Sequence, residues 1–128
     1  MKKESINGLK KKWYALFVKE KYKLKIVKAL AERKIESYVP HRNAIGDRNS
    51  KAKTLFSDFV FVKCDILKKR RNLSAIEGII SIVGDPFPES IPDKEINSLK
   101  NMIASGIEYN SKNSISLIKD LELLEHQN

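Results

Sequence analysis

The segment that most constrains the fold is Thr-Leu-Phe-Ser-Asp-Phe-Val-Phe-Val-Lys-Cys at residues 54–64. Aromatic and β-branched residues in a run without Gly or Pro are typical of a β-strand. Successive side chains of a strand point to opposite faces, so Phe59 and Phe61 share one face while Phe56 and Val60 share the other. Both faces are apolar. We expect helices on only one side of a small sheet, so some of these rings should line an exposed apolar patch.

Hydrophobic periodicity predicts the remaining elements. The run at residues 13–18 is typical of a central strand buried on both faces, and residues 21–34 have the spacing of an amphipathic helix. Further elements are a hairpin of strands 37–45 and 53–63 with a basic tip at 46–51, a helix at 66–76, a strand at 79–83 and a third helix from Asp93. This order is the split β-α-β-β-α-β pattern, so the fold class is α+β, with an antiparallel four-stranded sheet and packed helices.

Helix boundaries and helix faces follow from capping signals and apolar spacing. Asp65 and Asp93 are expected to cap the second and third helices, and Gly78 and Gly106 are expected to end them. The second helix should bury Leu67, Leu73 and Ile76, and the third should bury Ile96, Leu99, Met102 and Ile103.

The chain divides into three parts by composition. Residues 1–11 form a Lys-rich arm, residues 12–108 a single domain, and residues 109–128 a tail. The tail has helical apolar spacing over 114–125, so it is either a short amphipathic helix that docks on an apolar surface or the remnant of a linker. Docking on the domain's own apolar surface would make the tail autoinhibitory.

The net charge of +9 is unevenly distributed. Residues 1–53 hold 16 basic and 5 acidic residues, whereas residues 54–128 hold 9 basic and 11 acidic residues. Such an asymmetry indicates either a polyanionic partner for the first part or simply a solvated lysine-rich surface.

Several classes of protein are disfavoured by the sequence. The single cysteine, Cys64, cannot form an internal disulfide, and there is no secretory signal or transmembrane run, so a cytoplasmic protein is expected. His41 and His126 are isolated. Zinc-ligand spacing, a glycine-rich phosphate loop and a nucleophile motif are all absent from the sequence, so we expect neither an enzyme nor a metal or other cofactor.

Five segments together resemble the N-terminal domain of the NusG family of transcription factors, over about residues 12–105. They are Trp13-Tyr14-Ala15-Leu16, Ile35-Glu36-Ser37-Tyr38-Val39-Pro40, the strand Leu55-Phe56-Ser57-Asp58-Phe59-Val60-Phe61-Val62, Glu77-Gly78-Ile79-Ile80 with Val83-Gly84, and Ile91-Pro92-Asp93-Lys94-Glu95-Ile96. The five segments occur in the family's order.

Two departures from the family pattern indicate a specialised member. Ser57-Asp58-Phe59 stands where housekeeping members carry Pro-Gly-Tyr. This variation is similar to that of paralogues such as RfaH and the antiterminators of capsular polysaccharide operons. Nothing after residue 106 resembles the family's KOW β-barrel, so a stand-alone N-terminal domain, a truncated paralogue and a fragment all remain open.

The resemblance implies a transcription elongation or antitermination factor that binds RNA polymerase. In the family, an apolar depression of this domain grips the clamp helices of the largest polymerase subunit, and some members also touch non-template single-stranded DNA. The positions that match the polymerase-binding surface are Phe17, Phe56, Phe59, Phe61, Ile82 and Ile96. The candidates for nucleic-acid contact are Lys19, Lys21, Lys23, Arg42, Arg48, Lys51 and Lys53.

A second function class is an RRM-like module that binds single-stranded RNA. Such a module has the same element order and stacks bases on aromatic residues of its central strands. Ser57-Asp58 before Phe59 departs from the Lys/Arg-Gly that this motif expects, so the NusG-like interpretation is preferred. The basic run 68–71 either contacts nucleic acid or coats a helix, and coating is preferred.

Overall fold

The computed structural model describes residues 11–40 and 58–104. Their elements are β1 (Lys12–Val18), a 3-10 turn η1 (Glu20–Tyr22), α2 (Lys23–Glu32), β2 (Glu36–Tyr38), β3 (Phe59–Cys64), α4 (Ile66–Ser74), β4 (Ile79–Ile82) and α5 (Asp93–Ala104). This order confirms the predicted α+β class and the predicted type of each element within the described ranges. The hairpin tip, Gly106 and the whole tail lie outside these ranges.

The four strands form one antiparallel sheet in the order β2-β3-β1-β4. The longest ladder joins the two central strands and runs from the pair Lys12 and Cys64 to the pair Phe17 and Phe59. The described end of the run at residues 54–64 therefore supplies a central strand, Phe59–Cys64, and the predicted central position of the first strand is confirmed. In β2, Tyr38 pairs with Phe61, which confirms the described part of the predicted hairpin.

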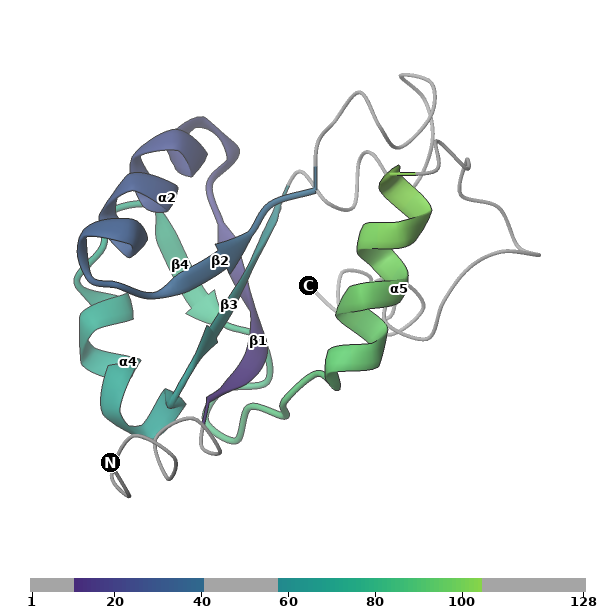
Figure 1. The fold of residues 1–128 in the computed structure, drawn as a ribbon. Helices are drawn as coiled ribbons and strands as arrows, with labels where there is room; N and C mark the ends of the chain where they lie inside the picture. The colour runs from purple at the N-terminus through teal and green to yellow at the C-terminus, as the bar shows by residue number, and fades with distance from the viewer. Residues whose placement is uncertain (1–10, 41–57, 105–128) are drawn as a thin grey trace.

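Helices cover both faces of the sheet (Figure 1). On one face α2 and α4 cover a core of thirteen buried residues that includes Leu16, Val60 and Val62. On the other face α5 covers a smaller core that includes Trp13 and Phe61. The prediction that helices lie on only one side is therefore wrong, because the stripe of α5 supplies the apolar surface that the second face needs.

The second helix differs in detail from its prediction. Asp65 occupies the N-cap position of α4, but its side chain forms no capping hydrogen bond. The helix ends at Ser74, before Gly78, and Leu67 is 86% exposed while the preceding Ile66 is buried. The start of the helix is rotated by one residue relative to the prediction. In α5, by contrast, all four predicted stripe residues are buried, and Asp93 is the first helical residue.

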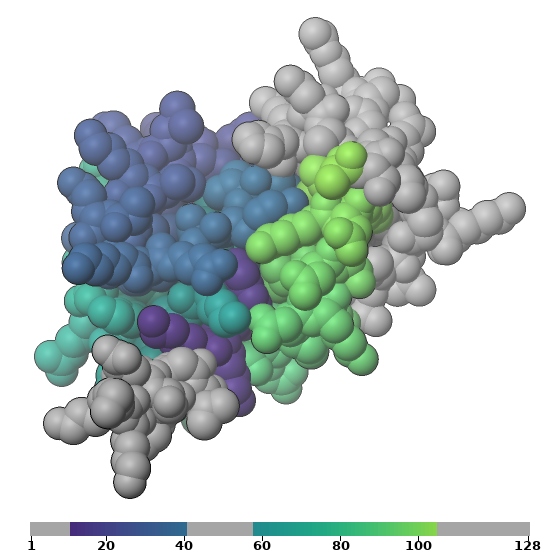
Figure 2. All heavy atoms as spheres, viewed as in Figure 1, coloured from purple at the N-terminus to yellow at the C-terminus, as the bar shows by residue number. Residues whose placement is uncertain are grey.

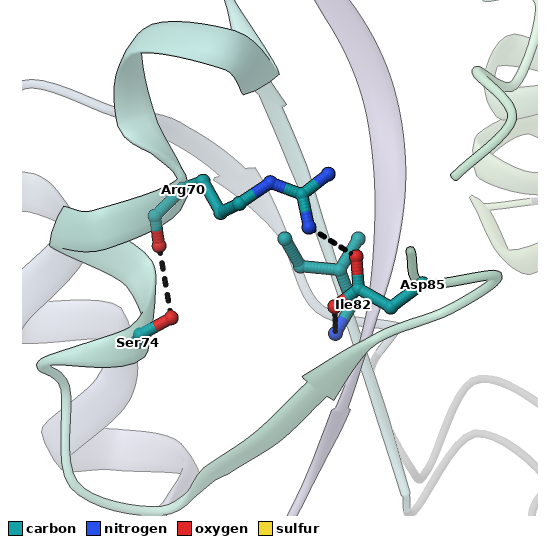
Figure 3. Close-up of polar contacts among 4 residues, drawn as sticks. All are labelled: Arg70, Ser74, Ile82 and Asp85. Atoms are coloured by element: carbon teal, nitrogen blue, oxygen red, sulfur yellow. Dashed lines mark hydrogen bonds and ion pairs between the residues drawn. The ribbon is translucent and has the colours of Figure 1, made fainter. Parts of the chain in front are cut away.

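Asp85 contacts the end of the edge strand β4 at Ile82 (Figure 3). Arg70 Nη1 of α4 lies 2.5 Å from Oδ1 of Asp85, whose Oδ2 accepts a 3.4 Å hydrogen bond from the backbone N–H of Ile82. The N–H of Asp85 in turn donates to the carbonyl oxygen of Ile82, at 3.1 Å. Together with a bulge that leaves Ile80 outside the register, these contacts make β4 a poor template for a further strand.

Candidate functional site

The aromatic face of the central strands lies beneath α5. Phe59 and Phe61 are 0% exposed and pack with Ile96 and Leu99 of the helix. Figures 1 and 2 show α5 as a separate layer against this side of the molecule. These rings therefore form the core in this conformation and present no open aromatic patch.

Polar contacts hold α5 on the sheet at two places. Lys63 Nζ of β3 lies 3.4 Å from Oδ1 of Asp93, in the first turn of the helix. Further along the helix, Lys100 Nζ lies 5.2 Å from the ring centroids of both Trp13 and Tyr38, within the range of cation–π attraction. Lys100 was not predicted as a contact from the sequence, although its place next to the buried stripe residue Leu99 was a usable signal.

Phe17 differs from the other candidate polymerase-binding residues in its exposure. It is only half-buried, at the end of β1, and its ring lies 4.9 Å from the ring of Phe59. The half-buried ring is thus supported by a ring that is completely buried. We call the accessible side of Phe17, on the face of the sheet covered by α5, the Phe17 rim.

The structure divides the remaining polymerase-binding candidates. Ile96 is completely buried on the underside of α5. Ile82 is also buried, but it belongs to the core under α2 and α4, on the opposite face of the sheet from Phe17. Ile82 pairs with Leu16, the residue before Phe17, and successive residues of a strand point to opposite faces of the sheet. Ile82 therefore cannot share a surface with Phe17. Phe56 lies outside the described residues.

Three of the candidates for nucleic-acid contact are brought together. Lys19, Lys21 and Lys23 occupy the junction between β1 and α2, where Lys19 and Lys21 are exposed. Lys21 Nζ lies 5.4 Å from the ring centroid of Tyr22. The other four candidates, Arg42, Arg48, Lys51 and Lys53, lie outside the described residues.

Residues 11–40 and 58–104 hold no cluster of candidate metal ligands. Within these ranges no three His, Cys, Asp or Glu side chains come together as possible metal ligands. Burial is the main cause that raises the pKa of Cys64 to about 11, with Asp65 raising it further and Lys69 opposing them. The thiol is therefore protonated and a poor nucleophile near neutral pH. None of the helices in the described part is long and apolar enough to cross a membrane.

The position of α5 also bears on the RNA-binding alternative. An RRM-like module needs exposed aromatic residues on its two central strands as a base-stacking platform. Here the corresponding rings, Phe59 and Phe61, are covered by α5. This arrangement removes the platform on which the alternative depends.

The architecture defines a class of small α+β domain, in which a four-stranded antiparallel sheet carries two helices on one face and a third helix on the other. Within this class, the model of the family described as transcription termination factor NusG matches residues 11–100. The chain belongs to the NusG family. Proteins of this family are non-enzymatic transcription factors that interact with RNA polymerase.

A solved structure supports the fold assignment. The structure titled "Domain interaction in Thermotoga maritima NusG" matches with a TM-score of 0.51 and 22% sequence identity. The match covers 78% of this chain and 60% of that one, so the chain spans well under the full length of this relative. A comparison with curated proteins gives no match.

Proposed function

We propose that this chain is a transcription elongation or antitermination factor that binds the clamp helices of RNA polymerase through the Phe17 rim. The observation that carries the proposal is the exposure of Phe17. Of the five described candidates for polymerase binding, Phe17 alone is partly exposed, and it is also backed by a buried ring. Rigid aromatic side chains on a packed base are typical of the residues that dominate binding energy at protein interfaces.

The buried candidates take a different role in this proposal. Phe59 and Phe61 support the rim from below, and Ile96 holds α5 beside it. Substitution of these residues would change the fold as well as binding, so they are unsuitable as tests. Phe56 remains a candidate contact from the sequence.

The basic junction between β1 and α2 completes the proposal. Lys19, Lys21 and Lys23 are proposed to contact non-template single-stranded DNA near the polymerase, together with Arg42, Arg48, Lys51 and Lys53. Clustered lysines attract phosphates through a salt-dependent term that carries little sequence information. A specialised, RfaH-like role and a cytoplasmic location stay predictions from the sequence.

A transcription assay tests this proposal. The full chain is added to paused elongation complexes, and pause duration is measured for wild type, Phe17→Ala and the control Leu24→Ala. Leu24 is an exposed apolar residue on α2, on the far side of the sheet from Phe17. We expect wild type and Leu24→Ala to shorten pauses equally, and Phe17→Ala to need at least about ten-fold more protein, as for loss of an interface hot spot. Equal activity of Phe17→Ala and wild type would contradict the proposed surface.

A further inference from the structure

A basic pocket lies at the other end of β1 from the Lys19 junction. It has a volume of about 350 Å³ and lies where β1 begins and β3 ends, between the segment that follows α2 and the first turn of α4. Its basic lining residues are Lys11, Arg33, Lys34, Lys63, Lys68 and Lys69. Because a strand rises about 3.3 Å per residue, the two basic regions are roughly 20 Å apart. The pocket is therefore separate from the proposed DNA-contacting junction.

The positive charge of this pocket is only partly neutralised. Lys63 pairs with Asp93, and Asp65 is the single acidic residue in the lining. Among the described residues, Lys34 and Lys69 form no ion pair. The remaining lining residues, Ile35 and Cys64, carry no charge near neutral pH, since the pKa of the Cys64 thiol is raised to about 11. Like charges gathered at one place repel one another, and a bound anion would offset that repulsion.

Backbone groups at the pocket reinforce this charge distribution. The pocket lies at the start of α4, and the amino-terminal end of a helix carries partial positive charge. The carboxyl end of α2 also lies here, but its last carbonyl groups are occupied. They accept hydrogen bonds from the backbone N–H groups of Arg33, Lys34 and Ile35, at 2.9–3.2 Å. The negative end of α2 is thus largely satisfied internally, whereas Lys34 and Lys69 have no ion-pair partner among the described residues.

Lys34 occupies a backbone position that favours glycine. It follows the C-cap of α2 with φ of +58°, in the left-handed region, and is the only non-glycine residue with positive φ in the described chain. Glycine is the common residue at this position after a helix because a Cβ is unfavourable there. A lysine at this position gives the pocket a cation, although its side chain makes the left-handed backbone conformation less favourable than it would be for glycine.

We propose that this pocket binds a compact anion bearing several phosphate groups, either a free polyphosphate or neighbouring phosphates of a nucleic-acid strand. Lysines act as point charges toward phosphate oxygens, and Arg33 adds a guanidinium group. A monovalent carboxylate would offset only one of the clustered charges, so a multivalent phosphate fits the pocket better. The proposal does not depend on polymerase binding.

Site-resolved titration tests the proposal. Inorganic tripolyphosphate is added to the ¹⁵N-labelled full chain, and amide shifts are followed by NMR. We expect saturable shifts at residues 33–35 and 64–69. Lys34→Gln should raise the half-saturating concentration at least three-fold, whereas Lys28→Gln, the same charge change on an exposed residue of α2 outside the pocket, should leave it unchanged.

A second variant separates binding from folding. Lys34→Gly removes the same cation but relaxes the positive φ, so it should weaken binding like Lys34→Gln while its melting temperature stays at or above that of wild type. A loss of binding without a loss of stability cannot arise from partial unfolding. Absence of saturable shifts, or equal weakening by Lys28→Gln, would overturn the proposed pocket.

Two further probes identify the source of the phosphates. If a twelve-nucleotide oligo(dT) shifts the same amides and displaces tripolyphosphate, the ligand is a nucleic-acid backbone. Shifts with tripolyphosphate alone indicate a free polyphosphate. An oligoglutamate of matched charge that binds as tightly as either probe would contradict a phosphate site.

Discussion

The surroundings of Cys64 determine the protonation of its thiol. It ends β3 with 3% of its surface exposed, and burial together with Asp65 raises the pKa of its thiol from 9.0 to about 11. Cys64 ends the apolar run at residues 54–64, and the structure buries it in the core under α2 and α4. The neutral thiol lets apolar packing on the α2 side of the sheet continue up to the basic pocket.

This shift predicts a pH-dependent difference in stability between wild type and Cys64→Ala. Between pH 9 and about 11 the unfolded chain has lost the thiol proton while the folded chain retains it, so ionisation favours unfolding. The unfolding free energy of wild type should therefore fall relative to Cys64→Ala by at most about 1.4 kcal/mol per pH unit. Below pH 8 the difference should be constant. Urea denaturation across the range measures it, and a constant difference up to pH 11 would contradict the shift.

At the scale of elements, the packing of α2 against the loop before β4 depends on Gly78. This residue has φ of +99°, and a Cβ added to it would collide with the Cβ of Tyr22. The backbone N–H of Lys19 also donates a 2.8 Å hydrogen bond to the carbonyl oxygen of Gly78. The glycine therefore fixes how the loop fits against the start of α2, although the sequence reasoning placed it at a helix end.

We predict that Gly78→Ala lowers the unfolding free energy by about 2–4 kcal/mol, through backbone strain combined with overpacking. Gly84→Ala is the matched control. Its φ of +92° imposes similar strain, but the nearest atom to an added Cβ is Pro88 Cα at 3.2 Å, a milder approach. Chemical denaturation should therefore show a larger loss for Gly78→Ala. Equal losses would show that Tyr22 moves away from the added Cβ at little cost in free energy, which would contradict the predicted overpacking.

The elements also show how far sequence periodicity determines structure. Ile96, Leu99, Met102 and Ile103 were correctly assigned to the buried face because each is apolar at regular helical spacing. The buried face of α4 was misassigned at its start, where Ile66 and Leu67 are adjacent and equally apolar. Contacts with the sheet decide between two such neighbours, and periodicity carries no information about those contacts.

At the scale of the whole molecule, the alternation along β3 correctly separated Phe59 and Phe61 from Val60 and Val62. It could not show what covers each face. The sequence predicted α5 as a helix but did not place it, and this placement turned an expected open aromatic surface into a core with Phe17 at its margin. The basic pocket could not be predicted from the sequence, because its lining comes from three segments that only the fold brings together.

The proposed polymerase-binding surface and the proposed phosphate pocket are separate sites on one domain. Phe17 lies on the face covered by α5, whereas the pocket lies at the end of the sheet where β1 begins. A substitution at one site should therefore leave the other intact, as expected for sites without shared contacts. A variant altered at one site can therefore serve as the control for a variant altered at the other site.

The most direct measurement of the central claim is calorimetric titration of the full chain with an isolated clamp-helix hairpin of RNA polymerase. We expect wild type, Leu24→Ala and Lys34→Gln to bind alike, and Phe17→Ala to bind at least about ten-fold more weakly while it remains folded at the temperature of the titration. Binding by Phe17→Ala that equals wild type, or absence of binding by the folded wild-type chain, would contradict the claim that the Phe17 rim recognises the polymerase.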